Sequence, residues 1–414
     1  MHHYTLRALV FVCVLVSTHA AFGETCSLNS PQEIIDCALI NHPKVRISEA
    51  GLSAANSLDA LAKQRPNPEV NSQTVWASTY GKPYFYTEYN FAHTFELGGK
   101  RDSRIEKAKA EQKKGEAYKL AAKEDVYLET LIILFRLRQI RSEVATVEDA
   151  LHTFSKIQKQ YRSRPRLSPE QQANLRLFEL AEGDYRMRLI PLLAEKDFFL
   201  HSLEIALGRP FEPSLAVMPK FRRAWPSLPS SINQDKLAGS GIKLAEANLK
   251  ISNSDLALSK SVAWPDLKIG PTVELQNSIR QNFTAYGFNF ILPLPLYNRN
   301  EAGRAFANFE MKKNEVQLQA NMKESMEERI HYEHNYARAV AALETSMSAQ
   351  DLRRRHEEVE GLFARGLIAG NLVIELHRQI HDFTKTYNAQ ELTAAESLTR
   401  VYMLEGRLPE EITW

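Results

Sequence analysis

The chain has 414 residues, of which 44% are hydrophobic and 25% are charged, and its formal net charge at pH 7 is +2. This balance is typical of folded proteins and excludes an intrinsically disordered chain. Lysine and arginine are dispersed rather than clustered with aromatic residues, so the composition gives no case for nucleic-acid binding.

The amino terminus has the pattern of a secretory signal peptide, which we predict to span residues 1–23. An apolar core at residues 8–16 is followed by small residues, and cleavage after Gly23 or after Ala20 fits the pattern. The exported chain would keep Cys26 and Cys37, which we expect either to form one disulfide or to remain free thiols. No other apolar run is long enough to span a bilayer as a helix.

Helical and extended patterns follow one another in the first half of the chain. Residues 30–64 predict a helix with an interruption at residues 41–43, and two prolines then exclude further helix. Two strand-like runs predict a β-hairpin over about residues 68–97. A long helix is predicted from Lys100 to about Tyr161, and a returning helix over residues 169–207.

The same order recurs after a proline-rich linker predicted at residues 209–232. A helix leads to a second hairpin at about residues 265–296, then to a helix predicted without a break from Glu301 to about Ala364, and then to a returning helix over residues 371–404. Corresponding landmarks are offset by about 200 residues, which indicates a duplicated unit. We therefore predict a first structural repeat at 24–208, a second at 233–408 and a C-terminal tail at 409–414.

The four strand-like runs have the length and the alternation of membrane-spanning β-strands. A half-buried hairpin in a soluble sandwich is the alternative, but each hairpin leads directly into a long helix rather than into another strand. An unpaired backbone group in hydrocarbon costs several kcal/mol, so a membrane-spanning sheet must close, and four strands are fewer than the roughly eight of the smallest barrels. Copies of the chain must therefore share one barrel.

Two copies would supply eight strands and three would supply twelve, and only the larger barrel leaves room for a lumen. The predicted fold class is mixed α and β: a trimeric outer-membrane β-barrel of twelve strands, four per protomer, continued by a long antiparallel α-helical barrel. Each helical rod of about 60 residues would be roughly 90 Å long. The polar strand face, which we expect to line the lumen, carries Glu88, Asn90, Lys268, Thr272, Glu274 and Gln276.

Two strand-to-helix motifs stand at corresponding places in the repeats: residues 95–101 read Phe-Glu-Leu-Gly-Gly-Lys-Arg, and residues 293–300 read Pro-Leu-Pro-Leu-Tyr-Asn-Arg-Asn. Over nearly the whole mature chain the sequence resembles the TolC-type outer-membrane factors, and the paired motifs resemble the CzcC-like branch, which serves heavy-metal resistance-nodulation-division (RND) pumps. The motif residues are Glu96, Gly98, Gly99, Lys100, Arg101, Pro293, Pro295, Asn298 and Arg299.

The resemblance implies a channel subunit of a tripartite efflux pump in the outer membrane of a Gram-negative-type envelope, with its helices in the periplasm. Its partners would be two further copies of itself, outer-membrane lipid, a periplasmic adaptor (membrane fusion) protein and an inner-membrane RND transporter. The implied cargo is divalent heavy-metal cations, conducted passively. A duct for organic drugs or for type I protein secretion has the same architecture, and a soluble periplasmic coiled-coil adaptor or scaffold is an alternative of another class.

The resemblance also implies which residues meet these partners. The adaptor would dock on the helix-to-helix turns, at Arg166, Leu167, Ser168, Arg365, Gly366 and Leu367, where Arg365 replaces the valine of the family. Glu375 aligns with the inner acidic position of the periplasmic aperture, where three carboxylates would attract cations and raise one another's pKa. The alternative for Glu375 is a solvated helix residue.

We expect neither enzymatic activity nor a cofactor, because the sequence contains no nucleotide-binding loop, nucleophile elbow or cysteine–histidine signature. Two pairs of histidines have helical spacing that could present two imidazoles on one face, namely His331 with His334 and His377 with His381. Two ligands on one helix are weak evidence for a metal, so we expect these histidines to be surface residues and predict no metal site.

Overall fold

The computed structural model describes residues 26–79, 81–222, 224–228, 237–277, 281–409, 412 and 414. The predicted signal peptide, residues 223 and 229–232 of the predicted linker, and residues 410, 411 and 413 of the predicted tail lie outside this part of the chain. The elements are α1 (Pro31–Asn41), α2 (Pro43–Lys63), β1 (Glu69–Thr79), β2 (Lys82–Phe95), α3 (Lys100–Arg162), α4 (Pro169–Leu207), the 3₁₀ helix η1 (Leu215–Val217), α5 (Ser240–Val262), β3 (Leu267–Asn277), β4 (Asn282–Ile291), α6 (Glu301–Thr345), α7 (Ala349–Ala364) and α8 (Gly370–Leu404).

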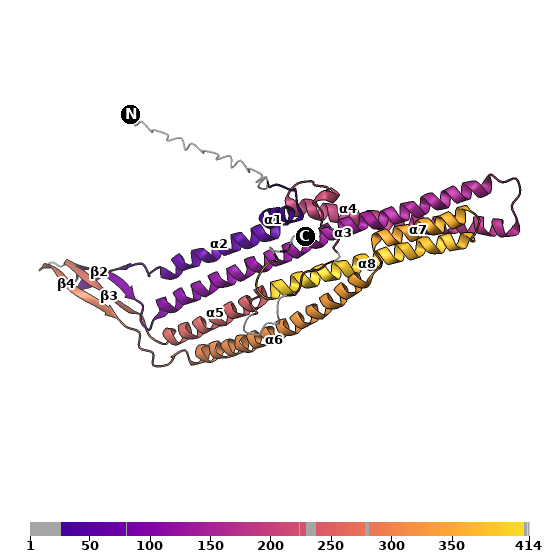
Figure 1. The fold of residues 1–414 in the computed structure, drawn as a ribbon. Coiled ribbons are helices and arrows are strands. Elements are labelled where there is room, and N and C mark those ends of the chain that lie inside the picture. Colours follow the sequence, from indigo (N-terminus) through magenta and orange to yellow (C-terminus); the bar gives the residue numbers. More distant parts are fainter. Residues whose placement is uncertain are drawn as a thin grey trace, which may run out of the picture.

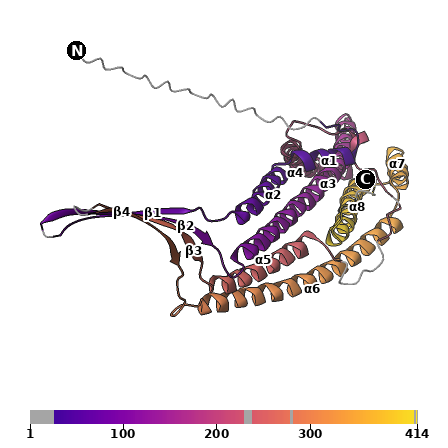
Figure 2. The ribbon, with the colours of Figure 1, turned by 90° about the vertical axis from the view of Figure 1, so that its left-hand side faces the viewer.

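The molecule is elongated, with a β-sheet at one end and helix-to-helix turns at the other (Figure 1). The helix α3 has 63 residues and is therefore about 95 Å long. Beside it run α2 and α5, and α6 packs on α5, so that these helices form a curved wall next to the sheet (Figure 2). Farther from the sheet, α3 packs against α4 and α8. Among the described residues the two halves of the chain thus share one helical wall.

The two predicted hairpins join into one antiparallel sheet with the strand order β1-β2-β3-β4. Strands from opposite halves meet at its centre, where Asn90 of β2 lies opposite Thr272 of β3. The pairing continues outward to Asn71 on β1 and to Gly287 on β4. The edges of this sheet are therefore β1 and β4, one from each half.

A cluster of buried side chains near the middle of the helices holds the halves together. It gathers residues of α1, α3, α4, α6 and α8, and it includes the apolar stripe that the sequence predicts on α3, such as Leu131 and Leu134. Trp414 also packs here: its indole N–H donates to the Tyr127 hydroxyl at 2.9 Å, and its ring meets Phe135 edge-on. The end of the predicted tail is part of the core.

A buried polar network crosses from α3 to α8 within this region. Arg138 forms an ion pair with Glu391, and both side chains are almost fully buried, at 3% and 1% exposed. Arg138 also donates to the Pro219 carbonyl at 2.7 Å, and Gln139 donates to Glu391 at 3.0 Å. Because each charge is paired and hydrogen-bonded, burial does not leave it uncompensated, and the network fixes how α3 and α8 pack.

Cys26 and Cys37 are joined by a disulfide, with their Cα atoms 5.7 Å apart. The bond attaches the segment before α1 to the buried side of that helix, where Cys37 belongs to the central cluster. Arg209 adds a second contact by donating to the Cys26 carbonyl at 2.8 Å. The segment before the first helix is thereby fixed to the body of the protein.

The prediction of one continuous second rod is wrong. The chain forms two helices there, because the backbone is extended at Ser346 and again at Ser348. The Ser348 hydroxyl accepts a hydrogen bond from the Asp351 backbone N–H at 3.1 Å, which caps the start of α7. A serine cap inside a sequence with helical periodicity therefore divides the rod.

The predicted end of the second hairpin is also wrong. We expected strand structure to about residue 296, whereas β4 ends at Ile291. Pro293 and Pro295 have no backbone N–H, so they cannot donate the hydrogen bonds that would continue the ladder.

One glycine permits the close contact between the two halves of the sheet. A Cβ atom placed on Gly270 of β3 would lie 1.8 Å from the Phe91 carbonyl oxygen of β2, so any side chain there would push the strands apart. The next residue, Pro271, cannot donate to the ladder, and the pairing of β2 with β3 is interrupted at this point. Gly287 on β4 is different, since a Cβ atom there would meet nothing within 4 Å.

We therefore predict that Gly270→Ala weakens the pairing of β2 with β3, at a cost of about 1–3 kcal/mol from overpacking. Hydrogen–deuterium exchange of purified full-length protein should show faster exchange in peptides covering β2 and β3. Gly287→Ala is the matched control and should exchange as the wild type does. Equal exchange in the two variants would contradict this account of the central contact.

Candidate functional site

One face of the sheet exposes a continuous group of large apolar side chains. On β2 these include Phe85, Tyr89 and Phe91, which are 38%, 38% and 44% exposed, and on β4 Phe288 is 85% exposed. The register places them on one face, together with Val70, Trp76, Phe95, Ile269, Leu275, Tyr286 and Phe290. An aromatic surface of this extent is too large to be left facing water and indicates an apolar environment or a partner.

The opposite face is mainly polar. Glu88 accepts hydrogen bonds from Tyr86 at 3.1 Å and from Asn90 at 2.8 Å, and Thr272 donates to Asn90 at 2.5 Å. Glu88 lies directly opposite Glu274, so two carboxylates share one row of this face. The apolar residues Val75, Phe283 and Ile291 interrupt the face toward the strand ends. A sheet with one aromatic and one polar face separates two different environments.

The first strand-to-helix junction is held by ion pairs. Gly98 and Gly99 both have positive φ, at 74° and 77°, which allows the sharp break between β2 and α3. Arg104 on α3 forms a bidentate pair with Glu96, donating through Nη2 at 3.0 Å, and this hydrogen bond lowers the pKa of the Glu96 carboxyl. The carboxylate therefore stays charged at a pH where an ordinary glutamate begins to protonate.

The same junction is tied to its neighbours. Lys100 donates to Asp266, the residue before β3, at 2.6 Å, which links the first hairpin's junction to the start of the second hairpin. Arg101 donates to the Lys63 carbonyl at the end of α2, at 3.1 Å. The sequence motif identified Lys100 and Arg101, but not Asp266, because nothing in the sequence indicates which distant carboxylate meets Lys100.

The second junction lacks paired glycines and uses asparagine instead. Asn300 adopts the left-handed conformation with φ 57°, and its side chain donates to the Ser259 carbonyl of α5 at 2.9 Å. The Asn298 side chain accepts from the Asn300 backbone N–H at 2.9 Å, and Arg299 donates to the Pro295 carbonyl at 3.3 Å. Asparagine tolerates this backbone better than most residues, which explains why the motif ends as it does.

The predicted docking turns lie together at the end of the helices away from the sheet (Figure 1). Arg166 and Leu167 precede Ser168, whose hydroxyl accepts from the Gln171 N–H while Gln171 accepts from the Ser168 N–H, a capping box that begins α4. The short turn is therefore fixed by its own side chains, and Arg166 is exposed on it.

The second turn ends α7 in a Schellman motif. Gly366 has φ 70°, its N–H donates to the Phe363 carbonyl at 2.8 Å, and the Leu367 N–H donates to the Leu362 carbonyl at 3.0 Å. Arg365 and Leu367 are exposed, Leu367 at 63%. A cavity of about 630 Å³ lies between the two turns. The structure thus brings the two predicted docking segments to one surface.

Glu375 lies on α8 one helical turn beyond the second docking turn. Its carboxylate accepts from Arg378 at 2.9 and 2.7 Å and from Gln379 at 2.8 Å. The hydrogen bond from Arg378 lowers the pKa of Glu375 in the single chain. Within one chain the negative charge of this carboxylate is therefore paired with the positive charge of Arg378 on the same helix.

The histidines are distributed differently from the expected surface positions. His331 and His334 are exposed as predicted, but His377 and His381 are buried, at 3% and 6% exposed, so the prediction is wrong for this pair. Burial lowers the pKa of both buried imidazoles. The ring of His377 packs edge-on against Phe154 of α3, with ring centroids 5.3 Å apart.

In the described part of the chain, no helix is both long enough and apolar enough to cross a membrane.

Three solved outer-membrane channels share this fold. The crystal structure of the Campylobacter jejuni CmeC outer membrane channel superposes with a TM-score of 0.71 at 16% identity, covering 92% of this chain and 86% of that one. The open state of the Neisseria gonorrhoeae MtrE outer membrane channel gives 0.70 at 14% identity, over 91% and 89% of the two chains.

CusC, whose crystal structures concern folding and transmembrane channel formation, gives a TM-score of 0.69 at 14% identity, over 91% of this chain and 92% of that one. No protein-family model and no protein of curated function matches the sequence. At these identities the likeness concerns the fold, and it covers nearly the whole chain. The chain therefore has the fold of these channels, a mostly helical body with a small antiparallel sheet.

Proposed function

We propose that the protein is the outer-membrane channel subunit of a tripartite RND-type efflux pump, working as a homotrimer that conducts divalent heavy-metal cations passively out of the periplasm. The observation that carries the proposal is the four-stranded sheet, which has one aromatic and one polar face, two edges that pair with no other strand of the described residues, and long helical rods continuing from it. The fold shared with solved outer-membrane channels supports the same conclusion.

The aromatic face supports a lipid environment. Strands of 10 to 14 residues are long enough to cross a hydrocarbon core when tilted. Exposing the rings of Trp76, Tyr286 and Phe288 to water would cost free energy, whereas contact with lipid is favourable for them; they are 75%, 82% and 85% exposed in the single chain. A soluble periplasmic adaptor or scaffold would expose this aromatic face to water, so the observation disfavours that alternative.

The two edges of the sheet support a shared barrel. Both β1 and β4 carry backbone groups without a strand neighbour among the described residues, and lipid cannot satisfy them. Pairing β4 of one copy with β1 of the next closes the sheet and keeps every pair antiparallel. Three copies give twelve strands, which is wide enough for a lumen lined by the polar face.

We predict that cysteines on the two edges form disulfides between chains. Asn71→Cys on β1, combined in turn with Cys at Ala285, Gly287 or Asn289 of β4, should give covalently linked multimers in intact cells at one of these registers. Within one chain the two strands are separated by three strand spacings, about 14 Å, which is twice the reach of a disulfide.

Val70→Cys with Asn289→Cys is the matched control, because residues 70 and 289 lie on opposite faces of the sheet. This pair should not link. Absence of cross-links in every test pair, in protein that light scattering shows to have the mass of one chain in mild detergent, would refute the shared barrel.

The proposed cargo is supported by the strand-to-helix motifs and by the acidic pair on the polar face. Glu88 and Glu274 lie opposite each other in register, and three copies would place six such carboxylates around the lumen. Carboxylate rings favour cations over anions. The two exposed docking turns, which meet at the other end of the helices, are proposed to hold the periplasmic adaptor.

We predict that a strain lacking this protein becomes more sensitive to divalent metals such as zinc, cobalt and cadmium, and that the wild-type gene restores growth. Leu367→Asp should not restore growth, because the charge would disrupt docking at an exposed apolar residue of the turn. When Leu367→Asp is combined with a pair of edge cysteines, the cysteines should still cross-link, because the barrel end is unchanged. Unchanged metal tolerance, with increased sensitivity to organic drugs, would instead identify a drug duct.

Glu375 is proposed to line the aperture. We predict that Glu375→Gln lowers the cation selectivity of single channels in planar bilayers, and that Arg378→Gln raises it by releasing the carboxylate from its partner. Because the hydrogen bond from Arg378 lowers the pKa of Glu375 within each chain, the cation selectivity of the wild type should be lost at a lower pH than that of Arg378→Gln. Identical selectivity in both variants and the wild type would place Glu375 away from the conduction path.

A further inference from the structure

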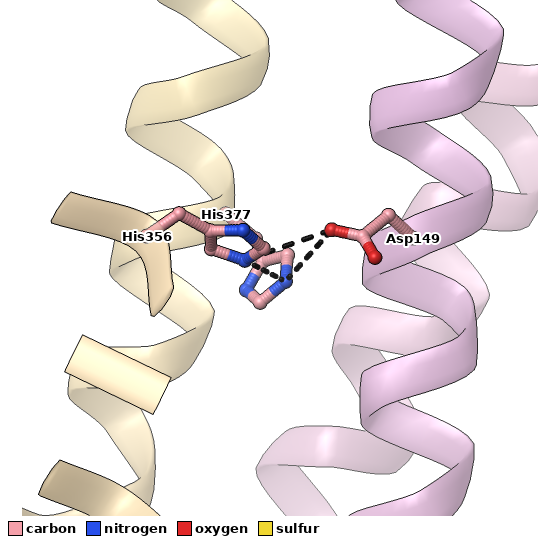
Figure 3. A group of neighbouring side chains, drawn as sticks. All are labelled: Asp149, His356 and His377. Carbon is pink, nitrogen blue, oxygen red and sulfur yellow. Dashed lines mark hydrogen bonds and ion pairs between the residues drawn. The ribbon is translucent and has the colours of Figure 1, made fainter. Parts of the chain in front are cut away.

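A cluster of histidine and acidic side chains lies where three helices meet, on the docking-turn side of the central core. Asp149 projects from α3, His356 from α7 and His377 from α8, and Figure 3 shows both imidazoles facing the carboxylate across the space between the helices. Glu360, one turn after His356 on α7, reaches the same place. Asp149 is about 200 residues from the other three in the sequence, and the sequence pattern identified only His377 as a candidate ligand.

We propose that Asp149, His356, Glu360 and His377 form a binding site for one divalent transition-metal cation of the Zn²⁺ type. This inference goes beyond the proposed transport function, because it concerns a cation held within the helical wall rather than one passing through the lumen.

The distances between the potential ligand atoms support tetrahedral coordination. The two imidazole Nε2 atoms are 3.2 Å apart, and they lie 3.4 and 3.5 Å from Glu360 Oε1. From Asp149 Oδ2 they lie 3.6 and 3.9 Å away. Ligands about 2.1 Å from a tetrahedral zinc ion are separated by about 3.4 Å, so these five separations, each of which involves an imidazole, are close to the edge length of a coordination tetrahedron. Two imidazoles and two carboxylates are also a ligand set that Zn²⁺ accepts.

The buried imidazole is oriented for coordination. The Val373 carbonyl oxygen can only accept a hydrogen bond, so the His377 Nδ1 atom, 2.9 Å away, carries the proton. In the neutral ring the lone pair is then on Nε2, the atom that faces the cluster. Thr153 donates to Glu360 Oε1 at 3.0 Å and orients this carboxylate from α3. Hydrogen bonds of this kind to the ligand side chains are typical of metal sites.

The cluster is closed on one side and open on the other. The His377 side chain is 2% exposed and that of His356 16%, whereas Asp149 is 54% exposed. A cation can therefore reach the buried imidazoles past the carboxylates without unfolding the helices.

A bound cation would hold α7 to its neighbouring helices, on which it otherwise packs weakly. The helix α7 buries none of its residues fully and packs on α8, and its start is a break after α6. Two of the four ligands come from α7, one from α8 and one from α3. Binding would thus attach α7 to α3 as well as to α8, close to the turn proposed to hold the adaptor.

The experiment is calorimetric titration of purified mature protein, free of a polyhistidine tag and treated with chelator, with zinc chloride. We expect about one Zn²⁺ per chain and an affinity at least about tenfold lower in His356→Gln and in Asp149→Asn. Replacing both exposed histidines, as in His331→Gln with His334→Gln, is the matched control and should leave the affinity unchanged. Cobalt chloride should give the strong visible absorption of a tetrahedral complex, lost in His356→Gln.

Circular dichroism without metal keeps the test independent of folding, since partly exposed His356 and Asp149 should be replaceable with little change in thermal midpoint. Zinc should raise the midpoint of the wild type and of the control variant only. No binding by the wild type, or equal binding by His356→Gln, would overturn the site and leave a hydrogen-bonded histidine–carboxylate cluster. Because these readouts use purified protein without transport, their failure does not bear on the efflux proposal, nor does a failure of efflux bear on them.

Discussion

A sheet that cannot be completed by one chain governs the architecture. Four strands expose aromatic rings on one face and carboxylates and amides on the other, and they end in two edges whose backbone groups have no strand neighbour in the described part of the chain. Lipid can accept the rings but not the edges, and water can accept the edges but not the rings. Pooling strands from several copies satisfies both requirements, and for that reason the assembly is central to the function that we propose.

The helices extend far from this sheet, and specific contacts hold them to it and to one another. Residues with positive φ allow the chain to pass from strand to helix at both junctions, and ion pairs hold the first of them, where Lys100 with Asp266 connects the two hairpins at their bases. Toward the middle, the buried Arg138–Glu391 pair fixes α3 against α8 across most of the sequence. Removing one member would leave an uncompensated buried charge, so the wall has little freedom to change its packing there.

Beyond that region a second cluster of buried apolar side chains joins α3, α4 and α8, through residues such as Phe154, Phe178 and Val373. The helix α7 begins after a break, buries no residue fully, and meets α3 through His356, Glu360 and their partners. The loosely packed element near the docking turns is therefore α7 alone, whereas α3, α4 and α8 share buried apolar side chains there. A cation at the histidine cluster would act on α7, because a weakly packed helix needs only a modest binding free energy to be held in place.

Local patterns in the amino-acid sequence were sufficient to predict the order of the elements, the alternation that separates the strand faces, the helical stripe on α3 and the turns at Ser168 and Gly366, because periodicity and capping depend on neighbouring residues. The predictions of one continuous second rod and of a strand to about residue 296 are wrong, because a serine cap and two prolines interrupt the helical and the alternating pattern at these places. The pairing of β2 with β3, the burial of His377 and its contacts with Asp149 and His356 could not be predicted in this way, because contacts between residues distant in the sequence depend on how helices and strands pack in three dimensions.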